Sequence, residues 1–320
     1  MKSFQYATAA SAQGARELLG ANGRYVAGGI DLLGEMKEYI AEPGILVNVK
    51  SLSGSNKIAP GDKSWSIGTN VTIAELEDHA ELRKVFPGLQ QAAAEVGSRQ
   101  IRNVATVGGN LAQHSRCWYY RHRDVLCLKK GGDTCYALHG ENKYHSLFTG
   151  NTCISPVVSN LSVMLGALDA NVIVQRGGKE TRMTVPEFYA KAWDNPTAHH
   201  SLEPGDLVMS VEIPTTGARS AYLQVSEKSA FDWALVSCAA AARIENGKLS
   251  QARVFLGAVA NVPYQSSAAN ELLEGKSLDE SLADQAATVL LEKAKAHSEN
   301  GYKIPIARAL VRRALLQLKA

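Results

Sequence analysis

Several features that define common protein classes are missing from this 320-residue sequence. No apolar stretch approaches the length that spans a bilayer, and the N-terminal segment lacks the uninterrupted apolar run of a secretory signal. Basic and acidic residues nearly balance, 34 against 31, and no basic run alternates with aromatic residues as in nucleic-acid-binding proteins. We therefore expect a cytoplasmic protein, or a periplasmic one if a signal-bearing partner exports it.

The two commonest nucleotide-binding motifs are also absent. The sequence contains no G-x-G, the core of the dinucleotide fingerprint of the doubly wound fold, and no G-x-x-x-x-G-K-[ST]. Two Gly-Gly turns are present instead. Paired glycines let backbone amides approach a pyrophosphate, because they lack a Cβ atom and tolerate positive φ. The candidate binding residues are Val26, Ala27, Gly28, Gly29, Ile30, Asp31, Leu32 and Leu33 in the first turn, and Thr106, Gly108, Gly109 and Asn110 in the second.

Cysteine is scarce, but four of the five cysteines fall within one 37-residue window. The clustered residues are Cys117, Cys127, Cys135 and Cys153, whereas Cys238 lies in the apolar run WALVSCAAAA and is expected to be a buried small side chain. Clustering in a chain without a secretory signal indicates metal binding. The spacing C-x9-C-x7-C-x17-C contains no C-x2-C pair of the kind that zinc ribbons use, so it favours a [4Fe-4S] cluster.

A zinc site with mixed cysteine and histidine ligands remains an alternative. The loop over residues 114–154, which contains this window, holds four of the eight histidines, most of which we expect to be solvated loop residues: His114, His122, His139 and His145. It is also rich in basic residues, which would offset the negative charge of a thiolate-ligated cluster: Arg116, Arg121, Arg123, Lys129, Lys130 and Lys143.

The order of predicted elements indicates an α+β protein in three parts. Residues 1–58 read as a small α/β lobe, and residues 59–216 as a second region with an inserted loop over 114–154. In this second region, residues 85–103 are expected to form a helix that enters a loop. Residues 217–320 read as three strands followed by helices. Tight turns are expected at Gly177-Gly178 and Asn246-Gly247.

The two glycine turns resemble the FAD pyrophosphate loops of the flavoprotein subunits of molybdenum hydroxylases. The resemblance is carried by AGGIDLL, by RQIRNVATVGGNL and by the later stretch EKSAFDWALVSCAAAARIENGKLSQARVFLGAVA. It implies a two-lobed FAD-binding domain of the vanillyl-alcohol-oxidase type, followed by a C-terminal domain of a small antiparallel sheet plus helices. Further FAD-binding positions implied by the resemblance are Ser115, Ser159, Asn160 and Lys228.

Two positions depart from the usual motifs of this family. Ile30 stands where the family usually has Thr, and Asn160 stands where it usually has Asp. Both changes weaken side-chain contacts to FAD without affecting backbone amides. Lys228 matches a basic position near the flavin, although a solvated lysine at a strand end explains it nearly as well.

The inserted loop resembles that of 4-hydroxybenzoyl-CoA reductase and of bacterial three-subunit aldehyde oxidoreductases. The segments RCWYYR and GENKYH carry this likeness, and by position they make the four clustered cysteines the ligands of a [4Fe-4S] cluster. The resemblance implies an FAD-containing electron-transfer subunit with no catalytic residues of its own. Its expected partners are a large molybdenum-cofactor subunit, a small [2Fe-2S] subunit and an external electron acceptor, with aldehydes as the substrate class.

Two other functions remain open from the sequence. A self-contained FAD reductase of the same superfamily would need its own substrate pocket, and the long cysteine loop and the full-length resemblance disfavour it. A zinc-stabilised scaffold without enzymatic activity would explain the cysteine window alone.

Overall fold

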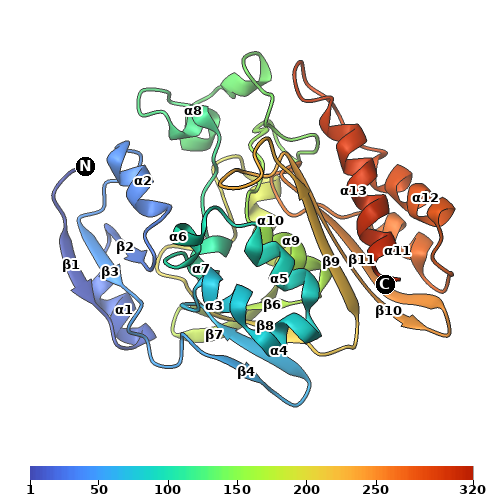
Figure 1. The fold of residues 1–320 in the computed structure, drawn as a ribbon. Coiled ribbons are helices and arrows are strands. Elements are labelled where there is room, and N and C mark those ends of the chain that lie inside the picture. The colour runs from blue at the N-terminus through green and yellow to red at the C-terminus, as the bar shows by residue number, and fades with distance from the viewer. Residues whose placement is uncertain (320) are drawn as a thin grey trace.

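The computed structural model describes residues 1–319 and contains three sheets that follow one another along the chain (Figure 1). Their strand orders are β1-β3-β2, β4-β5-β8-β6-β7 and β11-β10-β9. Each sheet is covered by helices, as the α+β prediction requires. The boundary predicted at residue 216 falls between the second and third sheets, whereas the one at residue 58 falls on the first residue of β4; both stay predictions.

The N-terminal lobe is a parallel three-stranded sheet with two helices, and it carries the first glycine turn. Its elements are β1 (Gln5–Thr8), α1 (Ala12–Leu19), β2 (Gly23–Val26), α2 (Leu32–Lys37) and β3 (Ile45–Asn48). Helix α1 begins where the Ser11 hydroxyl accepts a hydrogen bond from the Gly14 amide, and it ends at Gly20, whose φ is +58°. The glycine turn follows the carboxyl end of β2, the edge at which open parallel sheets bind ligands.

The second region is built on an antiparallel five-stranded sheet. Its strands are β4 (Ile58–Pro60), β5 (Ser64–Gly68), β6 (Asn171–Arg176), β7 (Lys179–Thr184) and β8 (Leu207–Pro214). Gly177 and Gly178 form the β6–β7 turn with φ of +57° and +85°, which confirms the predicted tight hairpin. The helices of this region are α3 (Ile73–Asp78), α4 (Ala80–Val85), α5 (Pro87–Ala94), α6 (Arg99–Arg102), α7 (Val107–Leu111), α9 (Asn160–Ala167) and α10 (Val185–Asp194).

The helix expected over residues 85–103 is interrupted. Helix α5 ends before Gly97, which has a φ of +52°, and Ser98 then caps the short helix α6 by accepting a hydrogen bond from the Ile101 amide. The chain thus makes two helices because a left-handed glycine and a capping serine are adjacent. This break places α6 just before the second glycine turn.

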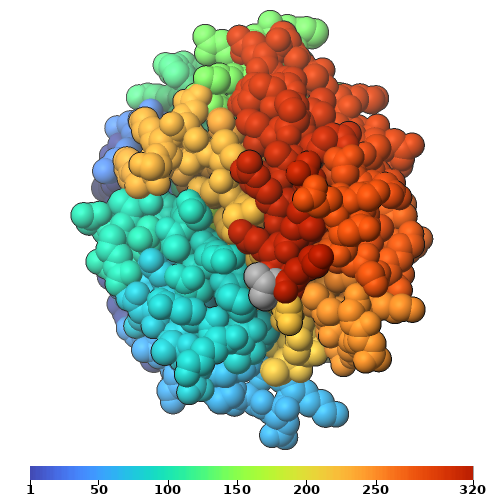
Figure 2. Space-filling view, turned by 45° about the vertical axis from the view of Figure 1, so that its right-hand side comes forward, coloured from blue at the N-terminus to red at the C-terminus, as the bar shows by residue number. Residues whose placement is uncertain are grey.

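The C-terminal part is an antiparallel three-stranded sheet covered by three helices, as predicted. The elements are β9 (Arg219–Val225), β10 (Val236–Glu245), β11 (Lys248–Gly257), α11 (Ser267–Leu273), α12 (Glu280–Leu291) and α13 (Lys303–Gln317). Asn246 and Gly247 form the β10–β11 turn, both with positive φ. Cys238 on β10 is fully buried, as expected. Figure 2 shows α12 and α13 (orange and red) forming one side of the molecule, beside the helices of the second region (cyan).

The inserted loop contains little regular structure. It holds α8 (Trp118–Arg121) and two 3-10 turns, η1 (Leu128–Lys130) and η2 (Tyr136–Leu138). Figure 1 shows this segment at the top of the molecule, above the sheets. In residues 1–319, none of the helices combines the length and the hydrophobicity that a membrane span requires.

Helix α9 lies at the centre of the molecule, and all eight of its residues are buried. It packs against α5 on one side and against β10 and β11 on the other. A Cβ atom added at Gly166 would lie 2.8 Å from Cε1 of Phe255 on β11, so the helix can approach the sheet only because this position is glycine.

We therefore expect Gly166→Val to lower the free energy of unfolding by about 1–3 kcal/mol, since a side chain inserted into a well-packed core displaces its neighbours. Urea unfolding followed by circular dichroism measures the change. The matched control is Gly301→Ala, where an added Cβ meets its nearest neighbour at an ordinary 3.5 Å. Equal stability of the two variants would contradict this account of the α9 packing.

Candidate functional site

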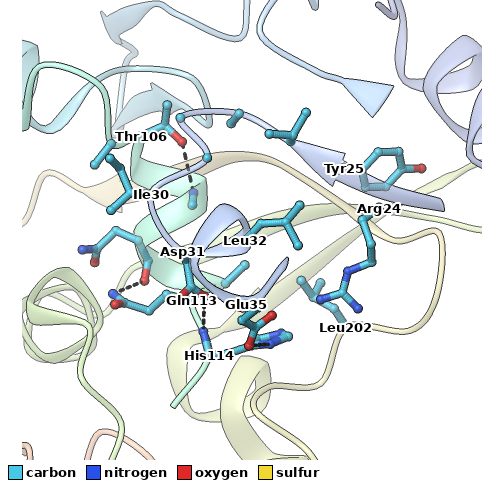
Figure 3. Close-up of a pocket in the computed structure, with 18 of the residues that line it drawn as sticks. Arg24, Tyr25, Ile30, Asp31, Leu32, Glu35, Thr106, Gln113, His114 and Leu202 are labelled. Atoms are coloured by element: carbon cyan, nitrogen blue, oxygen red, sulfur yellow. Dashed lines mark hydrogen bonds and ion pairs between the residues drawn. The ribbon is translucent and has the colours of Figure 1, made fainter. Parts of the chain in front are cut away.

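A cavity of about 1060 Å³ lies along the first glycine turn (Figure 3). This volume is at the upper end of the ~300–1,000 Å³ range of small-molecule and cofactor sites. The second glycine turn and the β9–β10 loop also line it. The predicted residues that face the cavity are Val26, Ala27, Gly28, Gly29, Ile30, Asp31, Leu32, Thr106, Gly109 and Asn110.

The first turn has the geometry of an anion-binding loop. Within residues 1–319, the amides of Gly28, Gly29 and Ile30 have no backbone or side-chain acceptor, so their N–H groups are available to a ligand. Gly29 has a φ of +72°, which glycine adopts without strain. A Cβ atom at Gly28 would lie 2.2 Å from the carbonyl oxygen of Val104, so glycine is required here for close contact with the chain before the second turn.

The second Gly-Gly pair, predicted as a turn with positive φ, is instead part of helix α7, which Thr106 caps, and neither Gly108 nor Gly109 has a positive φ. The Gly108 amide donates to the carbonyl oxygen of Thr69 at 2.9 Å, and the Gly109 amide donates to Thr106 Oγ1 at 3.2 Å. A Cβ atom at Gly108 would lie 1.8 Å from Thr69 Oγ1. Backbone amides were expected to be free at both Gly-Gly pairs, but they are free only at the first. The second pair contributes a backbone surface without side chains to the cavity wall.

The other predicted FAD-binding residues lie outside the lining of the cavity. Ser159 caps α9 and donates from its hydroxyl to Asn110 Oδ1 at 2.6 Å, so it acts behind a lining residue. Asn160 donates to Gln224 Oε1 at 2.8 Å. Leu33 lies on α2 beneath Gly29.

Ser115 and Lys228 are also set back from the cavity. The Ser115 hydroxyl is hydrogen-bonded to the Ser155 hydroxyl, and the Ser115 amide donates to Nδ1 of His199 at 3.1 Å. Lys228 lies on the β9–β10 loop, where its amide donates to the carboxylate of Asp232. The roles of these residues toward FAD stay predictions.

Sequence analysis missed Glu35, a buried carboxylate with only 1% of its surface exposed to solvent. Its Oε1 accepts a hydrogen bond from the Tyr120 hydroxyl at 2.6 Å and lies 2.9 Å from Nδ1 of His114. Burial opposes ionisation of this carboxyl, but the hydrogen bonds from His114 and Tyr120 and the charge of Arg121 outweigh it and lower the pKa of Glu35 to about 2. Glu35 is therefore a carboxylate at neutral pH.

Asp31 joins the same network from the first turn. Its carboxylate accepts from the His114 amide at 2.8 Å, and it pairs with Arg116 at 2.9 Å and with Arg121 at 2.6 Å. Figure 3 shows Asp31, Glu35 and His114 converging on one side of the cavity. These bonds connect the first glycine turn and helix α2 to the inserted loop.

Two aromatic contacts extend this network, and neither was predicted. The His114 ring stacks on His199 with ring centroids 4.0 Å apart and an interplanar angle of 6°. The Arg116 guanidinium lies over the Trp233 ring, 4.7 Å from its centroid, at the rim of the large cavity. No local sequence pattern predicts these pairs, because the two residues of each pair are more than eighty positions apart in the sequence.

The four predicted cysteine ligands line one small cavity. Cys127 and Cys153 are buried, Cys117 and Cys135 are partly buried, and none forms a disulfide. Among the described residues, no three of these thiol sulfurs lie within 4.8 Å of one another. A hydrogen bond with the Cys153 thiol lowers the pKa of Cys135, whereas burial raises the pKa of Cys117 to about 11.

The histidines of the loop divide into two groups. His122 and His139 are exposed, as expected, but His114 and His145 are not, so the prediction that most are solvated is wrong for half of them. His145 is 2% exposed, and its Nε2 lies 3.1 Å from Sγ of Cys117. Burial lowers the pKa of His145 to about 4, so its ring is neutral at physiological pH.

Of the six basic residues expected around the thiols, Lys129 lines the cysteine cavity. It is 7% exposed, and its Nζ donates to the carbonyl oxygen of Ala198 at 2.8 Å. Arg116 and Arg121 bind Asp31 instead, and Lys143 pairs with Glu227. The basic shell is therefore reduced to one buried cation.

Comparison with known proteins agrees with this arrangement. Residues 2–216 match the FAD binding domain in molybdopterin dehydrogenase, and residues 220–318 match the CO dehydrogenase flavoprotein C-terminal domain. The chain is 31% identical over 330 residues to the aldehyde oxidoreductase FAD-binding subunit PaoB of Escherichia coli K12, covering 100% of this chain and 99% of that relative. It is 26% identical to the 6-hydroxypseudooxynicotine dehydrogenase complex subunit alpha of Paenarthrobacter nicotinovorans, covering 98% and 93% of the two chains.

Solved structures show the same fold. Quinoline 2-oxidoreductase from Pseudomonas putida 86 aligns with a TM-score of 0.76 at 24% identity, covering 99% of this chain and 98% of that one. A carbon monoxide dehydrogenase from Hydrogenophaga pseudoflava aligns with a TM-score of 0.77 at 22% identity, covering 98% and 96%. The full-length match to PaoB and the family match over residues 2–216 show that this chain belongs to the FAD-binding flavoprotein subunits of the molybdenum hydroxylase family.

Proposed function

We propose that this chain is the FAD-containing electron-transfer subunit of a molybdenum-dependent aldehyde oxidoreductase. It receives electrons from the [2Fe-2S] clusters of a small partner subunit, and substrate is oxidised on a large molybdenum-cofactor subunit. The observation that carries the proposal is the large cavity along the first glycine turn, in a chain that matches an aldehyde oxidoreductase FAD-binding subunit along its whole length. The full-length match also disfavours a self-contained FAD reductase.

The residues of the large cavity fit FAD. The free amides of Gly28, Gly29 and Ile30 would hold the pyrophosphate, and the bare backbone at Gly109 leaves room beside it. Asn110, oriented by the Ser159 hydroxyl, supplies a polar side chain to the same wall. Bound FAD can exchange electrons singly or in pairs, which suits a junction between one-electron and two-electron donors and acceptors.

For the four thiols we favour a [4Fe-4S] cluster over a zinc ion. A tetrahedral zinc site with Zn–S bonds of about 2.3 Å places its sulfurs about 3.8 Å apart. Among the described residues no three of the thiol sulfurs lie within 4.8 Å of one another, which favours ligands that each bind a separate iron. Lys129 would offset part of the negative charge, and His145 contacts the Cys117 sulfur.

The division of the chain into residues 1–58, 59–216 and 217–320 is part of the proposal, with the loop over 114–154 as the iron–sulfur insert. The two family matches meet between residues 216 and 220, which supports the second boundary. Location in the cytoplasm, or in the periplasm through an exported partner, stays a prediction.

A pull-down of the tagged chain from its native cells tests the proposed function. We expect it to recover one large molybdenum-containing subunit and one small [2Fe-2S] subunit. The visible spectrum of this chain should show flavin with a broad iron–sulfur shoulder. A monomer that completes a reaction by itself would favour the self-contained reductase, and a colourless protein would favour the zinc scaffold.

We expect Gly109→Val to lose most of its bound FAD, because the β-branched side chain would project into the cavity beside the pyrophosphate. An added Cβ would lie 3.1 Å from Thr106 Oγ1, a contact that a small movement relieves, so the variant should still fold. Flavin absorbance per chain measures the loss, with Gly301→Ala as control. Stoichiometric FAD in a folded Gly109→Val variant would rule out this placement.

The wild-type chain should contain about four iron and four sulfide per molecule, and Cys135→Ala should contain almost none. Because the loop has little regular structure, it depends on its metal for order, and its disorder should weaken FAD binding through the bonds to Asp31 and Glu35. Iron, acid-labile sulfide and FAD titrations measure both effects.

Cys238→Ala is the matched control, since this cysteine is buried in β10 away from the loop. Its iron content should equal that of the wild type. Zinc in the wild type, or iron lost from the Cys238 variant alone, would show that the ligands are misassigned.

A further inference from the structure

A second cavity, of about 540 Å³, lies on the inserted loop and shares no lining residue with the large one. We call it the loop cavity. Its walls include Tyr120, Arg123, Leu126, Lys129 and Lys130. Its volume falls within the ~300–1,000 Å³ range of small-molecule sites. Nothing in the proposed FAD or cluster binding uses this space.

The loop cavity is basic. Three cationic residues, Arg123, Lys129 and Lys130, face one carboxylate, Asp124, whose side chain is 80% exposed. The Arg123 guanidinium is held over the ring of Tyr39, 4.4 Å from its centroid. The Arg123 side chain is 59% exposed and lies 3.9 Å from Asp124, so the positive charge shielded from solvent that a small anion would meet is that of Lys129, which is 7% exposed.

The large cavity has the opposite balance. Its lining contains three arginines, Arg16, Arg24 and Arg116, and six carboxylates, Glu17, Asp31, Glu35, Glu203, Asp206 and Asp232. Arg121 and Arg176, which lie outside the lining, pair with Asp31 and Asp206 and compensate part of this negative charge. Because FAD is proposed to occupy the large cavity, the loop cavity is the one that remains for a small anion.

The loop cavity also adjoins the four thiols. Tyr120 and Lys129 line both the loop cavity and the cysteine cavity, so single side chains separate the two spaces. Lys129 Nζ donates to the Ala198 carbonyl, and an ammonium has three N–H groups, so it can face an anion on one side and the thiols on the other.

We propose that the loop cavity binds a small, negatively charged one-electron acceptor. This inference rests on the proposed function, in which the cysteine loop holds a [4Fe-4S] cluster. Each acceptor molecule gains one electron here and the enzyme loses it, so two acceptor molecules oxidise an enzyme that one substrate has reduced by two electrons. The cationic residues bind and orient the acceptor beside the thiols.

Two acceptors of opposite charge test the proposal on the complete complex. Ferricyanide is a trianion and hexaammineruthenium(III) is a trication, and each takes one electron. In an Arg123→Glu, Lys130→Glu double variant, we expect kcat/KM for ferricyanide to fall about tenfold or more at low ionic strength. With hexaammineruthenium(III) it should stay unchanged or rise. Inhibition by ferrocyanide, which binds without accepting an electron, should weaken in parallel.

Lys276→Glu, Lys293→Glu is the matched control, because it makes the same charge change at exposed residues of the C-terminal part. It should leave both acceptors unaffected. Equal losses with both acceptors, or an equal loss in the control, would overturn the proposal. Iron, sulfide and FAD contents distinguish failure of the proposed function from failure of this inference. A wild type without a cluster overturns both. An intact cluster with an unchanged ferricyanide rate in the Arg123, Lys130 variant overturns this inference alone.

Discussion

The hydrogen bonds and the ion pair of the buried Glu35 carboxylate are the interactions on which both the large cavity and the cysteine loop depend. A carboxylate with 1% of its surface exposed is stable only when its oxygens are hydrogen-bonded and its charge is compensated. Here Tyr120 and His114 bond to it, and Arg121 lies 3.8 Å away. Removing one partner of such a buried pair typically costs about 3–5 kcal/mol. Since Glu35 is on α2 and its partners are on the inserted loop, these bonds hold the loop against the first glycine turn.

Asp31 strengthens this connection at the turn itself. It follows the free amides of the first glycine turn directly and is bonded to His114, Arg116 and Arg121. The first glycine turn and the loop are therefore bonded to each other, and the loop contains little regular structure of its own.

The three cavities differ in the charged residues that line them. The large cavity has more carboxylates than arginines, the cysteine cavity has four thiols and one buried lysine, and the loop cavity has three cationic residues and one carboxylate. Aromatic and histidine side chains, among them Tyr120 and His199, fill the space between them. The protein positions cofactors and sets their electrostatic surroundings, and the cofactors carry the electrons.

Residue patterns alone predicted most of the local elements, the family and the clustering of four cysteines, but not the break between α5 and α6. The turns at Gly177-Gly178 and Asn246-Gly247, the Ser11 cap and the buried Cys238 follow from residue chemistry that acts over a few positions. Tertiary packing set which amides are free, the burial of Glu35 and the place of Lys129 beside the thiols. Glu35 meets His114 and Tyr120 across about eighty residues of sequence, where no local pattern specifies the partner, because the path of the whole chain sets which charges meet.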